Sequence, residues 1–506
     1  MSPKSDGDPV SRPAEAVLAD LRALRTGDAP TRGGRTFAYV YDSGLEGLDG
    51  LAAAAYAEFA TVNALDMTVF PSVAALENDI VTAAARLLGT PETQGTFTSG
   101  GTESILLAVK TARDHARAER GVTAPELLVP STAHAAFHKA AAWLGVRLVT
   151  VPADPGSHRA DPEAMAAALT ERTVLAVASA PSYAHGVLDP VAEIAAAAAA
   201  RGVLCHVDAC VGGWLLPHLR RAGHPVPEFG LTVPGVTSLS VDLHKYGYVD
   251  KGASVVLYRD AELRRHQYFA CADWPGYPVV NPTAQGTKSA GLLAQSWAVL
   301  QHIGDDGYTA LAVRVREALD AVLAGLAPLA ASGEVRVLGE PSASLVALTV
   351  LDEGGEPDTG LVLHTADEMR ERGWYLQPQL SHGDSPASLH LTLTPASAGR
   401  TGPLLADLRA ALAAARRLPS PLPDPDTVAF AAALEPDTLT PEEAAAVLAA
   451  GGLGGGPHGA GPQGGPGLPA RSAGVLAMLD ALPVRLKERL LNEFVGTLFR
   501  TGAGPW

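Results

Sequence analysis

Short apolar runs alternate with helical stretches from about residue 71 onwards, and this alternation constrains the fold more than any other feature. The runs are bounded by turn residues and are almost continuously apolar, which is typical of strands covered on both faces of a parallel sheet. The expected strands span residues 127–129, 147–151, 174–179, 203–207, 236–241 and 254–258. The pattern therefore predicts an α/β fold built on a mainly parallel sheet.

Helical periodicity fills the intervals between these runs. Residues 103–120 carry Ile105, Val109, Ala112 and Ala116 at spacings of 4, 3 and 4, which places the four side chains on one buried face of a helix. Further helices are expected at residues 14–25, 190–201, 286–301, 308–326 and 361–372.

The pattern of expected strands and helices changes after residue 325, which predicts a second, smaller domain. Strands over 345–351 and 388–394 flank the helix over 361–372, and Gly373 follows that helix as a natural stop. The expected organisation is an N-terminal arm with a helical segment (1–70), a large domain (71–325), a small α+β domain (326–420), and a Pro/Gly-rich linker with terminal helices (421–506). In the last part, we expect 451–467 to be a flexible linker and 473–499 to be a helix pair that serves dimer packing.

Composition argues against several functional classes. The chain has 506 residues with 38 basic and 54 acidic side chains, so its net charge of −16 disfavours binding to nucleic acid or to an anionic membrane. Its three cysteines, Cys205, Cys210 and Cys271, show no zinc-type spacing and cannot all pair, and no HExxH motif is present, so we expect no disulfide scaffold and no metal site. The polar start and the lack of a long apolar window predict a cytoplasmic protein without a membrane anchor.

A glycine-rich turn, Thr98-Ser99-Gly100-Gly101-Thr102-Glu103-Ser104, opens directly into the expected helix at 103–120. Free backbone N–H groups and the positive end of the helix dipole make such a place an anion site, usually for phosphate. No lysine follows the glycines as in a Walker loop, and the spacing is not GxGxxG. Taken alone, the turn is equally compatible with a plain capped loop.

Two further segments follow expected strands. His206-Val207-Asp208-Ala209-Cys210 places a carboxylate at the end of an apolar strand, where ligands bind in open α/β sheets, although a helix cap is the alternative. Ser240-Val241-Asp242-Leu243-His244-Lys245-Tyr246 places a lysine in a half-apolar turn. A desolvated lysine has a lowered pKa and becomes a nucleophilic amine, whereas a lysine that reaches the surface does not.

Together the three segments provide a phosphate cradle, a carboxylate for a ring nitrogen and a lysine for an aldehyde, which is what pyridoxal phosphate requires. They resemble the fold-type I pyridoxal-phosphate enzymes of the group II decarboxylase superfamily, and most closely the sphingosine-1-phosphate lyase branch. The resemblance runs in order from about residue 60 to residue 394. It implies a fold-type I, transferase-like large domain with a mainly parallel seven-stranded sheet and a smaller C-terminal α+β domain.

The resemblance also implies roles for individual residues. Lys245, Asp208 and His134 would be catalytic, as the Schiff-base lysine, the partner of the ring nitrogen and the histidine that stacks on the ring. The remaining residues expected to bind the cofactor are Gly101, Thr102, His244 and Thr287. In the family, the hydroxyl at the position of Thr287 reaches the cofactor phosphate of the neighbouring subunit, so the resemblance implies a homodimer with shared sites.

The expected substrate pocket departs from the lyase branch. Tyr183 and His185 are expected to line it, and Asn63 is retained, but Asp66 stands where the branch has a histidine that helps to hold the substrate phosphate. Lys251, six residues after Lys245, matches a basic residue of the lyase site. Asp66 would therefore either pair with Lys251 or hold a substrate amine.

Three functions are compatible with these residues, each acting on or binding a small-molecule amine. The first is a carbon–carbon lyase that cleaves a β-hydroxy amine or an amino alcohol phosphate to an aldehyde; similarity along the chain and Lys251 favour it. The second is an amino-acid decarboxylase, which Asp66 favours. The third is a cofactor-binding protein without turnover, against which the presence of Lys245, Asp208 and His134 argues.

Overall fold

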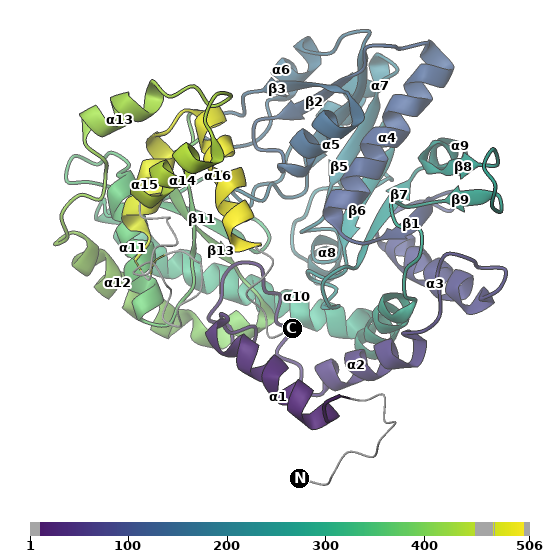
Figure 1. Cartoon of the computed structure of the whole chain (residues 1–506), viewed down its shortest axis with the longest axis horizontal. Coiled ribbons are helices and arrows are strands. Elements are labelled where there is room, and N and C mark those ends of the chain that lie inside the picture. The colour runs from purple at the N-terminus through teal and green to yellow at the C-terminus, as the bar shows by residue number, and fades with distance from the viewer. Residues whose placement is uncertain (1–10, 451–468, 470, 500–506) are drawn as a thin grey trace.

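A seven-stranded sheet forms the centre of the large domain in the computed structural model, which describes residues 11–450, 469 and 471–499 (Figure 1). Its strand order is β1-β7-β6-β5-β4-β2-β3, and β7 is the strand that runs antiparallel to its neighbours. The strands are β1 (Gln94–Thr98), β2 (Glu126–Pro130), β3 (Arg147–Val151), β4 (Thr173–Ser179), β5 (Leu204–Asp208), β6 (Ser238–Asp242) and β7 (Ser254–Tyr258). The predicted mainly parallel sheet is confirmed, with β1 as a strand that the apolar pattern missed.

Helices cover both faces of this sheet. Along β4, Leu175 and Val177 contact the layer that contains α4, while Ala176 and Ala178 contact the layer that contains α7, which explains the continuous apolar run. On the first face lie α4 (Gly101–Arg120), α5 (Ala136–Leu144) and α9 (Ala261–Arg264). On the other lie α3 (Pro71–Leu88), α6 (Pro162–Ala167), α7 (Val191–Ala200) and α8 (Leu216–Arg221). The predicted apolar stripe of α4 is buried as expected.

A long helix, α10 (Gly291–Ala331), runs beneath both domains and joins them (Figure 1). It joins the two helices expected at 286–301 and 308–326, although it begins at Gly291 rather than at residue 286. It bends at Gly304, whose φ of 61° interrupts the helical backbone. Helix α2 (Leu48–Phe59) packs on it, and Gly291 leaves room for the ring of Tyr56.

The small domain is an antiparallel four-stranded sheet with helices packed on it, as the predicted α+β unit requires. Gly373, with a φ of 79°, follows helix α11 at the predicted stop. The strand order is β10-β11-β13-β12. The elements are β10 (Val335–Val337), β11 (Leu345–Val350), α11 (Thr359–Glu371), β12 (Gln377–Gln379), β13 (Ser388–Thr392) and α12 (Thr401–Ala415).

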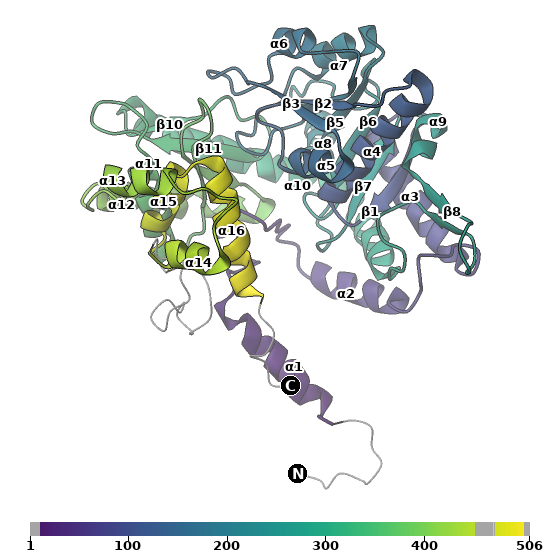
Figure 2. The same cartoon turned by 45° about the horizontal axis from the view of Figure 1, so that its top comes forward.

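Four C-terminal helices form a unit with its own apolar core against the small domain (Figure 2). They are α13 (Pro425–Ala432), α14 (Pro441–Ala450), α15 (Ala473–Ala481) and α16 (Val484–Leu498), of which α15 and α16 are the expected pair; the expected linker at 451–467 lies outside the described residues. The buried carboxylate of Asp367 in α11 accepts hydrogen bonds from the backbone N–H groups of Ser472 and Ala473, at 3.0 and 2.9 Å. Asp480 in turn accepts one from the N–H of Ser381 at 2.8 Å, so the unit is fixed to the small domain at two points.

Helix α1 (Ala14–Leu24) extends away from the body and buries none of its residues (Figure 2). Its apolar side chains Val17, Leu18, Leu21 and Leu24 are exposed. A separate two-stranded hairpin, β8 (Phe269–Cys271) and β9 (Val279–Asn281), also carries exposed apolar side chains.

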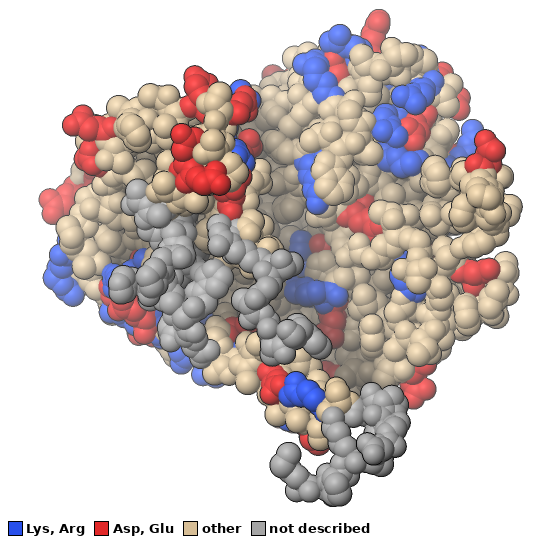
Figure 3. Space-filling model, in the orientation of Figure 1, with Lys and Arg blue, Asp and Glu red and all other residues tan. Residues whose placement is uncertain are grey.

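Acidic and basic side chains are interspersed over the described part of the face in Figure 3, and the surface is hollowed between the two lobes. Among the described residues, no helix combines the length and hydropathy needed to cross a bilayer.

Candidate active site

A cavity of about 310 Å³ lies where β4, β5 and β6 end and α4 begins. Parallel strands bring their carboxyl ends to one edge of the sheet, so motifs far apart in the sequence meet there. The predicted residues that line it are Gly101, Thr102, His134, Tyr183, Asp208, His244 and Lys245. The structure thus brings the three sequence motifs together around one space.

Lys245 follows β6 and forms an ion pair with a residue of its own turn. Its Nζ lies 3.0 Å from Oδ2 of Asp242, whose side chain is almost fully buried. Burial alone would lower the pKa of Lys245, but the negative charge of Asp242, together with the other acidic groups around it, holds the pKa well above its usual value. The expectation of a lowered lysine pKa is therefore wrong, because it considered desolvation without this carboxylate.

Asp208, the last residue of β5, lines the cavity with a carboxylate fixed by two donors. Its Oδ1 accepts hydrogen bonds from the backbone N–H of Cys210 at 3.1 Å and from the hydroxyl of Ser240 at 3.3 Å. Beneath it, the buried ring of His206 lies 3.2 Å from Ser240 Oγ, and burial lowers the pKa of His206 to about 4. The His206 ring beneath Asp208 is therefore uncharged at neutral pH.

The start of α4 forms the opposite wall. Gly100 has a φ of 149°, and a Cβ atom on Gly101 would lie 2.6 Å from Sγ of Cys210 and 2.9 Å from Oδ1 of Asp242, so both positions require glycine. The first N–H groups of a helix have no partner within the helix and favour an anion. His244 stands nearby, with Nδ1 2.7 Å from the backbone oxygen of Ala253.

His134 lies in the loop between β2 and α5. Its Nδ1 accepts a hydrogen bond from the N–H of Ala136 at 3.1 Å, which fixes the ring. The ring of Tyr183 meets it edge-on, with centroids 6.3 Å apart, and the hydroxyl of Tyr183 donates to Oε1 of Gln377 in the small domain at 2.7 Å.

These residues fit pyridoxal phosphate. Oδ1 of Asp242 is buried without a hydrogen-bond partner and faces the space that glycine leaves open at residue 101. The cavity offers a carboxylate, a lysine and a helix N-terminus on separate walls, which suit a ring nitrogen, an aldehyde and a phosphate.

Other predicted residues lie outside this cavity. Asn63 accepts a hydrogen bond from the N–H of Leu65, and Asp66 is exposed and accepts from the N–H and hydroxyl of Thr68, which lower the pKa of Asp66. Within the described structure Asp66 and Lys251 form no ion pair, so the suggested pairing is not seen. Thr287, after β9, is exposed and does not line the cavity of its own chain.

Lys251 lies close to the cavity instead. Its Nζ donates to the backbone oxygen of His244 at 3.3 Å and stands 4.7 Å from the ring centre of Tyr41. Lys251 is exposed at the surface, but desolvation of its ammonium group among these neighbours and the positive charge of Lys245 lower its pKa to about 8.

Sequence reasoning missed three residues of the site: Asp242, Cys210 and Tyr41. Asp242 stands three residues before Lys245, and that spacing on a tight turn was a usable signal. Cys210 is buried, and it also lines the cavity. Tyr41 comes from the N-terminal segment, and no local pattern links it to Lys251.

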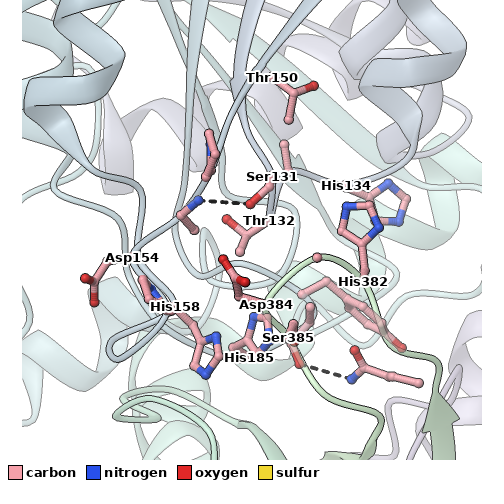
Figure 4. Close-up of a pocket in the computed structure, with 18 of the residues that line it drawn as sticks. Ser131, Thr132, His134, Thr150, Asp154, His158, His185, His382, Asp384 and Ser385 are labelled. Atoms are coloured by element: carbon pink, nitrogen blue, oxygen red, sulfur yellow. Dashed lines mark hydrogen bonds between the residues drawn. The ribbon is translucent and has the colours of Figure 1, made fainter.

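His185 lines a second, larger cavity of about 540 Å³ that shares His134 and Tyr183 with the first (Figure 4). Its Nε2 lies 2.9 Å from the hydroxyl of Ser385, and its ring stacks on that of His158 at 4.2 Å.

Comparisons with known proteins agree with this geometry. The pyridoxal-dependent decarboxylase conserved domain matches residues 15–348, and a C-terminal putative HTH domain of pyridoxal-dependent enzymes matches residues 425–497. The sphingosine-1-phosphate lyase of Arabidopsis thaliana is 35% identical over 429 residues, 83% of this chain and 76% of that protein. The corresponding protein of Oryza sativa is 36% identical over 385 residues, 75% of this chain and 69% of its own length.

Solved structures give the same result. The sphingosine-1-phosphate lyase of Burkholderia pseudomallei superposes with a TM-score of 0.74 at 35% identity, covering 82% of this chain and 94% of that one. The glutamate decarboxylase of Lactobacillus brevis shares the fold, with a TM-score of 0.69 at 18% identity over 82% of this chain and 96% of that one.

Proposed function

The chain belongs to the pyridoxal-dependent decarboxylase family and is a pyridoxal phosphate-dependent lyase, and from this premise we propose that it cleaves a β-hydroxy amine to an aldehyde and a smaller amine. The observation that carries the proposal is Lys251. Its ammonium group lies beside the His244–Lys245 segment, next to the cavity rather than in it, where it favours an anionic group such as the phosphate of an amino alcohol phosphate. Relatives named as sphingosine-1-phosphate lyases support the same reaction class.

We assign the cofactor contacts as follows. The N-terminus of α4 at Gly101 and Thr102, with His244, would hold the phosphate; Asp208 would hold the ring nitrogen; and His134 would cover the ring. When bound, pyridoxal phosphate accepts the electrons of the bond that breaks.

Lys245 and Asp242 handle the protons. The ion pair keeps Nζ of Lys245 protonated, so Lys245 must lose a proton before it can act as a nucleophile. After losing its proton, Nζ of Lys245 would be a base inside the cavity, placed to accept the proton of a substrate hydroxyl, as carbon–carbon cleavage requires. Asp242, 3.0 Å away, then stabilises the ammonium group that forms.

A product assay tests the reaction class. Purified holoenzyme is supplied in parallel with phosphorylated β-hydroxy amines and with L-amino acids, and aldehyde and CO₂ are both quantified in a single turnover. We expect aldehyde from the phosphorylated amines without CO₂. Release of CO₂ without aldehyde would instead identify an amino-acid decarboxylase. Asp66 favoured that function in the sequence, but its side chain lies on the surface and is bonded to Thr68.

The pH dependence of substrate binding is a second expected result. The pKa of Lys251 is lowered to about 8, so its positive charge is present at pH 7 and is lost as the pH rises through that value. KM for a phosphorylated amine should therefore rise by about tenfold between pH 7 and pH 9. In Lys251→Arg, which stays charged, the rise should disappear. A rise that persists unchanged in Lys251→Arg assigns the pH effect to another group.

We propose that the enzyme works as a homodimer with shared sites. The exposed apolar side chains of α1 and of the β8–β9 hairpin support a partner surface, and Thr287, exposed soon after that hairpin, is free to reach a second chain. Sedimentation of the holoenzyme should give twice the chain mass of 52.0 kDa. A sedimenting mass of one chain would contradict this proposal.

A cytoplasmic location and the lack of a nucleic-acid partner also remain proposals. The three cysteines are free, and two of them are buried, which suits a reducing compartment. Residues 425–497, which match the putative HTH domain, contain eight acidic and four basic side chains. Arg485 and Arg489 of α16 already face Asp437 and Glu493, so little positive charge is left for a phosphate backbone.

A further inference from the structure

The second cavity adjoins the cofactor cavity and is large enough to hold a carbon chain. Its volume is about 540 Å³, and it shares His134 and Tyr183 with the cavity that contains Lys245. Its walls come from the loops after β2, β3 and β4 and from the turn between β12 and β13 (Figure 4). A substituent of an amine bound near Lys245 can therefore extend past His134 into this space.

Most of the side chains that line the cavity can form hydrogen bonds. They are Ser131, Thr132, Thr150, Asp154, His158, His185, Gln379, His382, Asp384 and Ser385. Leu380 is the one aliphatic side chain larger than proline in the lining, and the lining contains neither lysine nor arginine. An alkyl chain would bury these polar groups against it, which costs free energy.

Two polar atoms in the lining lack a partner. Nδ1 of His185 is buried and unbonded, and the His185 side chain is 4% exposed. The hydroxyl of Thr132 on the facing loop is also buried and unbonded. The other nitrogen of His185 lies 2.9 Å from the hydroxyl of Ser385, so the ring is held in a fixed orientation. Neither atom has accessible surface in the empty cavity, so each gains a hydrogen bond only where a ligand group that can donate or accept one comes close enough to displace its neighbours.

The electrostatics select among such groups. Burial, with the nearby His158 and His390, lowers the pKa of His185 to about 3, and burial also lowers the pKa of His158, so both rings are neutral at pH 7. The rim carries the carboxylates of Asp154 and Asp384. A phosphate finds no counter-charge here. A hydroxyl group both donates and accepts, so it satisfies a neutral imidazole nitrogen in either tautomer as well as a threonine hydroxyl.

We propose that this cavity binds a hydroxylated carbon chain of the substrate, so that the enzyme selects a polyhydroxylated amine over one with a long alkyl chain. The inference rests on the proposed function, because it takes the reacting group of the substrate to be an amine. It does not depend on which bond of the substrate is then cleaved. The turn that closes the cavity is tied to His185 through Ser385 and to the C-terminal unit through Ser381 and Asp480. The cavity is therefore preformed, which limits the entropy lost on binding.

Equilibrium titration of the holoenzyme with two primary amines of six carbons tests the proposal. The probes are n-hexylamine and 1-amino-1-deoxy-D-glucitol, and binding is followed by the absorbance of the bound cofactor, with each Kd expressed for the uncharged amine. The glucitol amine should bind about tenfold more tightly, the effect of one satisfied hydrogen bond. Neither probe needs to be cleaved, so the result stands whether or not the product assay yields aldehyde.

Variants assign the preference to the cavity. Thr132→Val and His185→Phe should each reduce the ratio of the two Kd values to within about threefold of unity. Thr232→Val, at an exposed threonine outside both cavities, should leave the ratio unchanged. Equal or tighter binding of hexylamine to the unmodified enzyme overturns the proposal, as does a preference that persists in both cavity variants.

Discussion

Replacing Lys245 by alanine should lower kcat by about ten-thousand-fold or more, the effect of removing a group that reacts covalently. Lys245 is the lysine that lines the cofactor cavity, and its Nζ is paired with Asp242 at 3.0 Å. Lys251 lies outside the lining and donates to the backbone of His244, so it is not placed to substitute.

The same replacement should also destabilise the fold, because it leaves Asp242 as a buried carboxylate without a cation. Breaking a buried pair by removing one partner costs about 3–5 kcal/mol. Lys245 lowers the pKa of Asp242 in the folded state, so the pair stabilises the fold above the unfolded-state pKa of the carboxyl and loses this effect as the pH falls. The melting-temperature difference between the two proteins should therefore shrink on acidification.

Lys245→Arg separates the chemical role from the structural one. Arginine keeps a positive charge for Asp242 but cannot react with an aldehyde at neutral pH. It should lose activity as fully as alanine does while retaining more of the melting temperature. Lys139→Ala, at an exposed lysine that stacks on Trp143, is the matched control and should alter neither property. Turnover within a hundredfold of the unmodified enzyme in both Lys245 variants would refute the assigned role.

The large sheet could be predicted because most of its strands are buried on both faces and read as apolar runs. β1 escaped this criterion: it has the sequence Gln94-Gly95-Thr96-Phe97-Thr98, and two of its buried residues, Thr96 and Thr98, are polar. The side chain of Leu257 packs against Gly95, so this position of β1 needs a small residue, whereas the apolar pattern requires a large one. Apolar patterning detects side chains that fill space and misses positions where a strand must leave space.

The site residues could be predicted where a short motif at the end of a strand contained the reactive side chain. Asp208 ends a strand, His134 and Lys245 follow one, and the three converge because parallel strands end at one edge. The charge state of Lys245 was not predictable from burial, because it depends on Asp242 through a turn whose geometry only the fold defines. Asp66 shows the opposite case, in which the sequence suggested a role in the site and local hydrogen bonds to Thr68 hold the carboxylate elsewhere.

Asp208→Asn should lower kcat by about 10²–10³-fold, the usual effect of removing a preorganised charge from an active site. A neutral amide cannot stabilise positive charge on the ring nitrogen that Asp208 is proposed to face. The amide oxygen can still accept the hydrogen bonds that Cys210 and Ser240 donate to Oδ1, so the fold should be retained. The measurements are kcat, the absorbance of the bound cofactor and the melting temperature.

Asp189→Asn is the matched control, because Asp189 is also a buried carboxylate, in the loop after β4, but does not line the cofactor cavity. It accepts hydrogen bonds from the N–H groups of Ala160 and Ser179, both at 2.8 Å, and burial raises its pKa to about 6. The asparagine oxygen can accept one of these hydrogen bonds, but the NH₂ group cannot accept the other. The melting temperature should therefore fall while kcat stays within about threefold. If the two variants lose activity equally, the loss reflects disturbed packing at this sheet edge, and Asp208 has no specific electrostatic role. If Asp208→Asn alone loses activity with its melting temperature preserved, the carboxylate itself is what the reaction requires.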